Sequence, residues 1–189
     1  MTFKVLDRDT APAASVPFLE EIESKKGFVP NIAGVLAAAP PALEAFVTLQ
    51  ELLGKTSLSA VEKDILFLAI STFNDSPYCQ AAFAKQAEAD GMTWEMEEAV
   101  KTGQPLPNPK LDALRNYARG VLENRGRPDD ATIEAFLAAG YGPANALEIL
   151  LAISFNTLTN YTARLAHPPI DAAVTGQPSG QQQQAVLNN

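Results

Sequence analysis

Almost the whole sequence divides into apolar segments of helical spacing that begin near a proline and end near a glycine. One such segment starts at Pro40-Pro41 and ends at Gly54, and its apolar residues recur every three or four positions. Proline at the first helical position and glycine after the last one are favoured at helix ends. Convincing alternation of polar and apolar residues, the pattern of strands, is absent from the sequence. The chain is therefore predicted to be all-α.

The same pattern predicts about eight helices packed as one helical bundle. Ser59 and Glu62 form the S-x-x-E pattern of a capping box, so one helix is expected to begin at Ala60. This helix is apolar on all sides from Ile65 to Ile70, which is typical of a central, buried helix. The expected helical segments are 15–27, 32–38, 40–54, 60–73, 77–90, 94–101, 109–124, 144–166, and one that is capped by Asp129 or Asp130 and ends at Gly140.

The length of 189 residues suits a single domain. Apolar residues make up 47% of the chain and charged residues 19%, which is a globular composition. From Gly176 onward, however, Gly, Pro and Ser precede the run Gln181 to Gln184. Such a composition is typical of disorder. We expect a helical domain over residues 1–172 and a flexible, glutamine-rich tail over residues 173–189.

The charge and the rarity of two residue types exclude several classes of function. Asp and Glu number 22 against 14 Lys and Arg, which gives a net charge of −8. An acidic chain lacks the basic surface of a nucleic-acid-binding protein, and anionic membranes repel it. One Cys and one His exclude a disulfide framework within the chain and a Cys/His zinc site. We expect no cofactor, no metal, no nucleic acid and no membrane partner.

Targeting signals are not visible in the sequence. The N-terminal residues lack the apolar region of a signal peptide. The longest apolar run, Ile65 to Ile70, is far shorter than the roughly 18 residues that a membrane-spanning helix needs. We therefore expect a cytoplasmic protein, and a lone thiol fits that reducing compartment.

Cys79 is the residue with the clearest chemical potential, because it falls in the first turn of an expected helix. If Ser76 is the N-cap, Pro77 is the first helical residue and Cys79 the third. The helix dipole and the unpaired N–H groups there favour a thiolate and lower the pKa of the thiol. Thiolates attack peroxides and disulfides. The competing interpretation is that Cys79 is simply a small buried hydrophobic residue.

The residues around Cys79 have structural explanations. Serine is a favoured N-cap, worth about 1 kcal/mol over alanine, and the hydroxyl of Ser76 is expected to accept a hydrogen bond from the N–H of Cys79. Glu62 is interpreted as a capping-box partner in preference to a catalytic base.

Polar residues further along the chain also favour structural roles. Asn156, Asn160 and Arg164 share one face of the longest expected helix, which predicts an interhelical network or a subunit contact in preference to substrate binding. His167 is interpreted as a helix-end residue.

Two consecutive segments, Leu58 to Ile70 and Asn74 to Phe83, resemble the carboxymuconolactone decarboxylase and alkyl hydroperoxidase D-like superfamily, and in particular its peroxidase-related branch. The resemblance covers roughly residues 10 to 172. It extends to Gly27-Phe28-Val29-Pro30-Asn31 and to the run Asn160 to Ala166, followed by Pro168 and Asp171. It implies an alkyl hydroperoxidase D-like helical domain that self-associates as a dimer, trimer or hexamer.

The redox pattern of this family is an acidic residue followed, about a dozen residues later, by C-x-x-C-x-x-x-H. The family's acid falls on Asp64, its resolving Cys on Ser76, its attacking Cys on Cys79 and its His on Phe83. The chain therefore keeps the attacking Cys and an acid, and departs from the pattern at the other two positions.

These departures have chemical consequences. Without a Cys at position 76, a catalytic cycle has to pass through a sulfenic acid on Cys79 that an external thiol, or Cys79 of another subunit, resolves. Without the His, the proton relay from acid to thiol loses its middle member, although Asp64 can reach the site through water. Phe83 makes the surroundings of the thiol drier, which raises the pKa of the thiol and opposes the helix dipole.

The resemblance implies a thiol-dependent, antioxidant peroxidase with Cys79 as nucleophile and Asp64 and Ser76 at its site. Its substrate would be a small peroxide and its reductant an external thiol or dithiol. Two alternatives stay open on the sequence alone. One is a non-redox, decarboxylase-like enzyme acting on a small organic acid, and the other is a catalytically degenerate, oligomeric binding protein.

Overall fold

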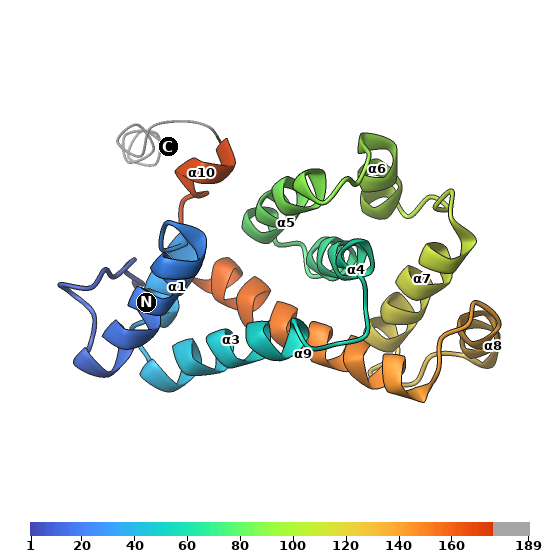
Figure 1. The fold of residues 1–189 in the computed structure, drawn as a ribbon, viewed down its shortest axis with the longest axis horizontal. Helices are drawn as coiled ribbons and strands as arrows, with labels where there is room; N and C mark the ends of the chain where they lie inside the picture. The colour runs from blue at the N-terminus through green and yellow to red at the C-terminus, as the bar shows by residue number, and fades with distance from the viewer. Residues whose placement is uncertain (176–189) are drawn as a thin grey trace.

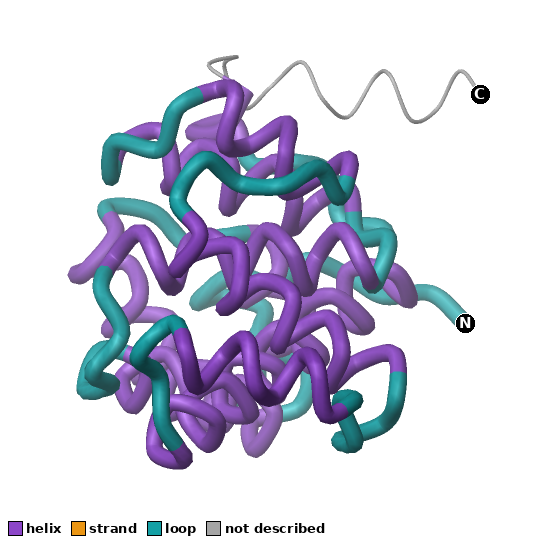
Figure 2. Tube along the Cα trace, turned by 90° about the vertical axis from the view of Figure 1, so that its right-hand side faces the viewer, coloured by secondary structure: helices purple, strands orange, loops and turns teal. Residues whose placement is uncertain are grey.

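The computed structural model describes residues 1–175, which form helices joined by loops and contain no strand (Figures 1 and 2). This confirms the predicted all-α class, and eight of the ten α-helices have seven or more residues. The elements are η1 (Ala13–Ser15), α1 (Val16–Lys26), α2 (Asn31–Leu36), α3 (Pro40–Leu53), α4 (Ala60–Phe73), α5 (Pro77–Ala89), α6 (Trp94–Thr102), α7 (Pro109–Glu123), α8 (Asp130–Ala138), α9 (Pro143–Ala166) and α10 (Ala172–Thr175).

Helix α4 is the central element, as its all-round apolarity predicts. It packs against α5, α6, α7 and α9 (Figure 1). The predicted capping box begins it: the N–H of Glu62 donates to Ser59 Oγ at 3.3 Å, and the N–H of Ser59 donates to Glu62 Oε2 at 2.8 Å. The hydroxyl of Tyr141 donates to the other Glu62 oxygen at 2.6 Å. Glu62 thus has the structural role expected of it.

Aromatic rings connect α3, α4, α5 and α9, the helices that surround the candidate site. The ring of Phe155 on α9 lies 5.5 Å from that of Phe46 on α3 and 5.7 Å from that of Phe67 on α4. The ring of Phe67 in turn lies 5.1 Å from that of Phe83 on α5. Such offset and tilted ring pairs add to the stabilisation from burial alone.

A buried polar network joins α4 to α9, as the spacing of the α9 asparagines predicts. The side-chain amide of Asn160 donates to Ser71 Oγ at 3.1 Å, and Ser71 Oγ donates to Asn156 Oδ1 at 3.3 Å. Asn74, which ends α4, donates to Asn160 Oδ1 at 2.9 Å. The network therefore fixes the end of α4 against the middle of α9.

The tight turn after α4 is held from the same helix. Asp75 adopts a left-handed backbone conformation with φ of 49°. Arg164 on α9 donates to the carbonyl oxygens of Asn74 and Asp75 and pairs with the Asp75 carboxylate at 2.6 Å. This turn sets the point at which α5 begins.

The chain after α9 folds back over the bundle. His167 ends α9 in a left-handed conformation with φ of 47°, which fits the expected helix-end role. Beyond the two prolines, Asp171 accepts hydrogen bonds from the N–H of Asn31 at 2.7 Å and from the hydroxyl of Tyr78. One carboxylate thus joins the C-terminal segment to the start of α2 and to α5.

Residues 173–175 of the expected tail form the end of α10. Residues 176–189 lie outside the described residues. No single helix within residues 1–175 is long and apolar enough to cross a membrane. Only α8 and α9 taken together meet those criteria, and they are bent by 112° relative to each other.

Replacing Asp171 with alanine is expected to lower the free energy of unfolding by about 3 kcal/mol, because hydrogen bonds to a charged acceptor contribute about 1.5–3 kcal/mol each. Urea denaturation followed by circular dichroism measures the loss. Asp9→Ala, which removes an exposed carboxylate, is the matched control and should cost much less. Equal losses for the two variants would contradict a stabilising role of the hydrogen bonds that Asp171 accepts.

Candidate functional site

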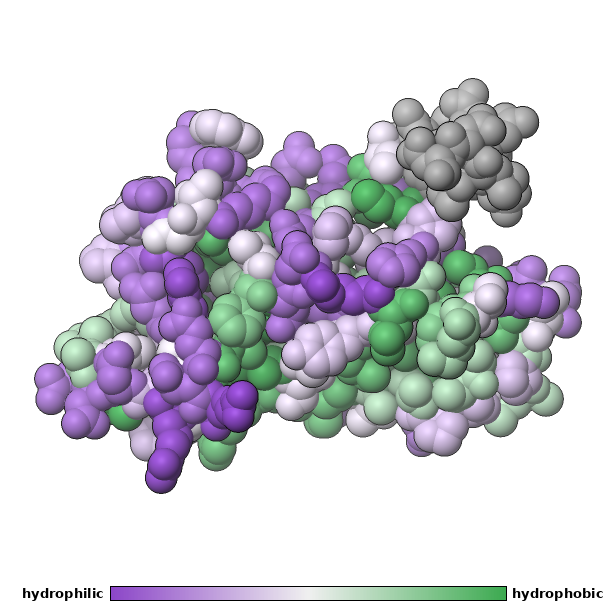
Figure 3. Space-filling view, turned by 180° about the vertical axis from the view of Figure 1, so that it is seen from behind, coloured by the Kyte–Doolittle hydropathy of each residue, from purple (hydrophilic) through white to green (hydrophobic). Residues whose placement is uncertain are grey.

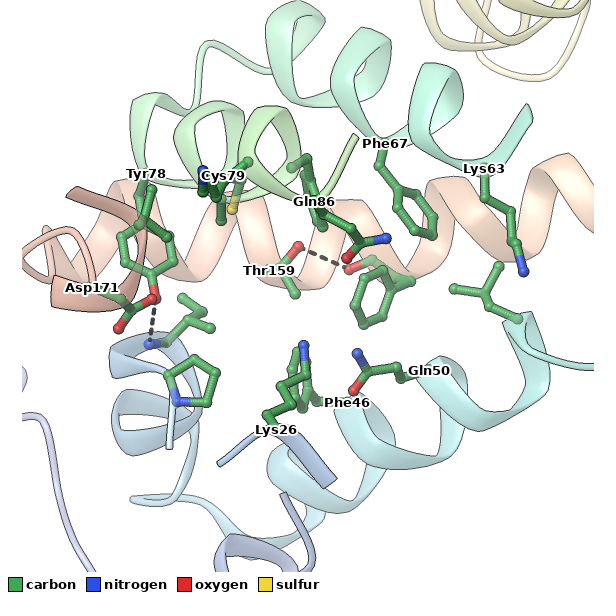
Figure 4. A pocket seen from close by; sticks show the side chains of 18 of the residues that line it. Lys26, Phe46, Gln50, Lys63, Phe67, Tyr78, Cys79, Gln86, Thr159 and Asp171 are labelled. Carbon is green, nitrogen blue, oxygen red and sulfur yellow. Dashed lines mark hydrogen bonds between the residues drawn. The ribbon is translucent and has the colours of Figure 1, made fainter. Parts of the chain in front are cut away.

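A cavity of about 490 Å³ lies between α3, α4, α5 and α9, and the residues near the start of α2 and the C-terminal segment close one side of it (Figure 4). Its volume is in the range, about 300–1,000 Å³, of sites for small organic molecules. The side chains of Phe46, Phe67, Phe83 and Phe155 supply much of its apolar wall. Cys79 is part of the same wall (Figure 4).

Cys79 occupies the third position of α5, as predicted, and its residue surface is only 3% exposed. Burial is the largest influence on the thiol and raises its pKa. The neighbouring side chains of Ser76, Asn160 and Thr159 act in the opposite direction, because they favour the thiolate. The sequence left two opposing effects on the thiol open, and the net direction is the raised pKa expected from dry surroundings.

Ser76 precedes α5 at the N-cap position, but its hydroxyl does not cap the helix. Its Oγ is fully buried and has no hydrogen-bond partner within the described chain, so the expected bond from the N–H of Cys79 is not formed. The backbone of Ser76 is tied instead, through its N–H to Ser71 O at 3.0 Å and its carbonyl to the N–H of Gln80 at 2.9 Å. These two bonds leave the side chain beside the Cys79 thiol, where it lowers the thiol pKa.

Asp64 is buried on α4, and the structure does not bring it into contact with Cys79. Its Oδ1 accepts from the side-chain amide of Gln86 at 3.1 Å, and Gln86 lies two turns beyond Cys79 on α5. Burial and the nearby Asp90 carboxyl raise the pKa of Asp64 to about 6. Gln86 and Asp90 both line the cavity, whereas Asp64 does not.

Phe83 stands where the family pattern has a histidine, and it lines the cavity next to Phe67. This confirms the expected dry surroundings of the thiol. Residues 1–175 contain no group of three His, Cys, Asp or Glu residues placed to hold a metal ion.

Several cavity residues have no distinguishing sequence signal. Lys26, Gln50 and Lys63 extend from three different helices into the cavity (Figure 4). A lysine that enters a cavity has the same sequence context as one that points to solvent. Tyr78 and Asp171 lie within the segments that carry the family resemblance. That resemblance is the one feature of the sequence that could have pointed to them as site residues.

Comparison with known proteins gives matches only among solved structures. No family model matches the sequence, and neither does any curated protein. The structure is similar to the alkylhydroperoxidase AhpD core of an uncharacterized peroxidase-related protein from Ralstonia eutropha JMP134, with a TM-score of 0.79, 20% identity and coverage of 93% of this chain and 94% of that one. A peroxidase-related protein from Silicibacter sp. TM1040 gives a TM-score of 0.77 at 21% identity and covers 93% and 95%.

A debrominase is also similar, with a TM-score of 0.70, 21% identity and coverage of 90% of this chain and 92% of that one. A cysteine-to-alanine variant of this debrominase has been solved in complex with 2,3,4-tribromopyrrole. The resemblance seen in the sequence is thus confirmed at the level of the fold, which is alkyl hydroperoxidase D-like.

Because Cys79 is the only cysteine, its titration can be followed without interference. The thiol is expected to titrate above the value of about 8.5 for an ordinary cysteine. Its alkylation rate should therefore keep rising with pH through pH 8.5. Ser76→Ala should raise the pKa further, because it removes a group that favours the thiolate. Thiolate absorbance and iodoacetamide kinetics measure the pKa of Cys79 in the native protein and in the Ser76→Ala variant. The denatured protein serves as the reference. A native pKa below 8 would contradict the dominance of burial.

Proposed function

We propose that this chain, with its alkyl hydroperoxidase D-like fold, is a thiol-dependent peroxidase that acts through Cys79 alone and is restored by an external thiol or dithiol. The observation that carries the proposal is the position of the chain's one thiol on the wall of a cavity sized for a small organic molecule. The solved peroxidase-related structures of the same fold support it. An antioxidant role in the cytoplasm follows, since external thiols are available in that reducing compartment.

In the first step, the Cys79 thiolate attacks one oxygen of a hydroperoxide and the O–O bond breaks. The alkoxide leaves and takes up a proton to become an alcohol, while Cys79 becomes a sulfenic acid. An external thiol then attacks the sulfur, releases water and forms a mixed disulfide. A second thiol of the reductant restores the Cys79 thiol and carries away the disulfide. Ser76 cannot form an internal disulfide, so the reductant has to reach the cavity.

The raised pKa of Cys79 sets the character of this reaction. Fewer molecules carry a thiolate at neutral pH, but each thiolate is more nucleophilic, because nucleophilicity rises with the pKa of the thiol. The unpartnered hydroxyl of Ser76 is available to donate to a charged sulfur. Thr159, which lines the cavity, and Asn160 also favour the charged form.

The debrominase supplies a second candidate reaction for the same thiol. The aromatic wall of the cavity suits a halogenated ring. In that reaction the thiolate would take the bromine as Br⁺ to form a sulfenyl bromide, and the ring carbon would take up a proton from solvent in its place. A first external thiol would then release bromide and form a mixed disulfide, and a second would restore the Cys79 thiol. The decarboxylase-like alternative finds no support among the similar structures and is not favoured.

Treatment with a small excess of cumene hydroperoxide should convert Cys79 to a sulfenic acid at least tenfold faster than a free cysteine peptide at the same thiolate fraction, because the cavity concentrates an organic peroxide. Trapping with dimedone and mass spectrometry measures the rate. Cys79→Ser should give no adduct. An external dithiol should return the oxidised protein to the thiol. A rate no greater than that of the peptide would overturn the peroxidase proposal.

We also propose that the chain forms a homo-oligomer through the outer face of α9. Leu147, Leu150, Tyr161 and Leu165 are 43–67% exposed there. Their spacing places all four on one side of the helix. Exposed apolar side chains gathered on one helix face, here interrupted only by Ser154, are typical of a contact between protein copies.

In multi-angle light scattering, the native protein is expected to have at least twice the mass of one chain. Leu165→Glu should shift it toward the monomer, because it places a charge in the contact. Trp94→Glu, on the exposed face of α6, is the control and should leave the mass unchanged. A monomeric native protein would refute the contact, and a disulfide-linked dimer after peroxide treatment would show that Cys79 of two subunits can meet.

A further inference from the structure

The cavity carries two positive charges that the peroxide reaction leaves unused. Lys26 at the end of α1 and Lys63 on α4 both line it (Figure 4). Within residues 1–175 neither ammonium lies within ion-pair distance of a carboxylate. The third lining lysine, Lys85, differs because it pairs with Glu88 at 2.8 Å.

The acidic groups of the cavity are already engaged. Asp171 accepts from the N–H of Asn31 and from the hydroxyl of Tyr78, and it acts on Lys26 only at a distance. Asp90 adjoins the buried Asp64, whose pKa is raised first by burial and then by the Asp90 carboxyl, while Lys63 acts on Asp64 only weakly and without an ion pair. The carboxylates of the wall are thus held in other interactions, whereas Lys26 and Lys63 remain available to a ligand.

The polar and apolar parts of the wall complement each other. The amide of Gln50 is directed into the cavity, as is the ammonium of Lys26 (Figure 4). Lys26 is exposed as a residue, and its ammonium points into the cavity without an ion pair, so it gains from a bound anion. The remaining surface consists largely of phenylalanine rings, which bury an apolar body. Hydrogen peroxide would leave most of a 490 Å³ cavity unfilled.

We propose that the substrate is an amphipathic organic hydroperoxide that carries a carboxylate. Lys26 and Lys63 attract the carboxylate, Gln50 donates a hydrogen bond to it, and the phenylalanine rings hold the apolar body with its O–O bond near Cys79. This inference rests on the proposed peroxidase function, because it names the substrate class of that same site. A neutral hydroperoxide of equal size lacks the charge that the lysines recognise.

Binding is tested apart from the chemistry, on Cys79→Ser protein. Calorimetry compares 4-isopropylbenzoate with 4-isopropylbenzamide, which have the same size and shape but differ in charge and in one oxygen replaced by NH₂. The carboxylate is expected to bind about tenfold more tightly. Lys26→Gln and Lys63→Gln should each remove most of this preference while leaving the affinity for the amide unchanged. Lys55→Gln removes an equal charge from the surface outside the cavity and should preserve the preference.

The chemistry is tested on the native protein with cumene hydroperoxide and its 4-carboxy derivative. The carboxylated peroxide is expected to oxidise Cys79 about tenfold faster at limiting concentration, and Lys26→Gln and Lys63→Gln should abolish that advantage. Fast oxidation without any preference for the carboxylate would overturn this inference and leave the peroxidase function intact. Preferential carboxylate binding without oxidation of Cys79 would refute the peroxidase function. The preference of the cavity for carboxylate ligands would then still stand.

Discussion

The hydrogen bonds of Asn160 with Ser71 and Asn74 set the geometry on which the site depends. They attach the end of α4 to the middle of α9 inside the protein, where an unpaired amide would be costly. The turn that follows α4 is thereby fixed, and with it the start of α5 and the position of Cys79. Asn160 also favours the thiolate of Cys79. One buried amide thus serves both the packing of the helices and the chemistry of the thiol.

Two departures from the family pattern change the thiol site in opposite ways. Phe83 in place of histidine completes a row of rings and keeps water away from the sulfur, which raises the thiol pKa. Ser76 in place of the resolving cysteine adds an unpartnered hydroxyl beside the sulfur, which lowers it. Desolvation prevails because the thiol is almost completely buried. For the proposed peroxidase reaction, such a site would require a substrate able to enter a dry cavity and a reductant supplied from outside.

The sequence predicted those features that depend on local contacts. The capping box of Ser59 and Glu62 and the placement of Cys79 in the first turn of a helix follow from residues three positions apart. The sequence could not show that Asp64 turns toward Gln86, because that choice depends on how two helices pack. The roles of Lys26 and Asp171 were equally hidden, since the partners of Asp171 lie 93 and 140 positions away.

A negatively charged protein can still select an anion, because electrostatic interactions are local in salt solution. At physiological ionic strength the screening length is about 8 Å, so most of the carboxylates on the outer surface act weakly on the cavity. Inside the cavity the dielectric constant is lower and the same two charges interact more strongly. In the proposed binding of a carboxylated substrate, Lys26 and Lys63 therefore outweigh the net charge of −8 for a molecule that has already entered. The overall charge would slow the approach of anions, whereas the two lysines would favour their retention.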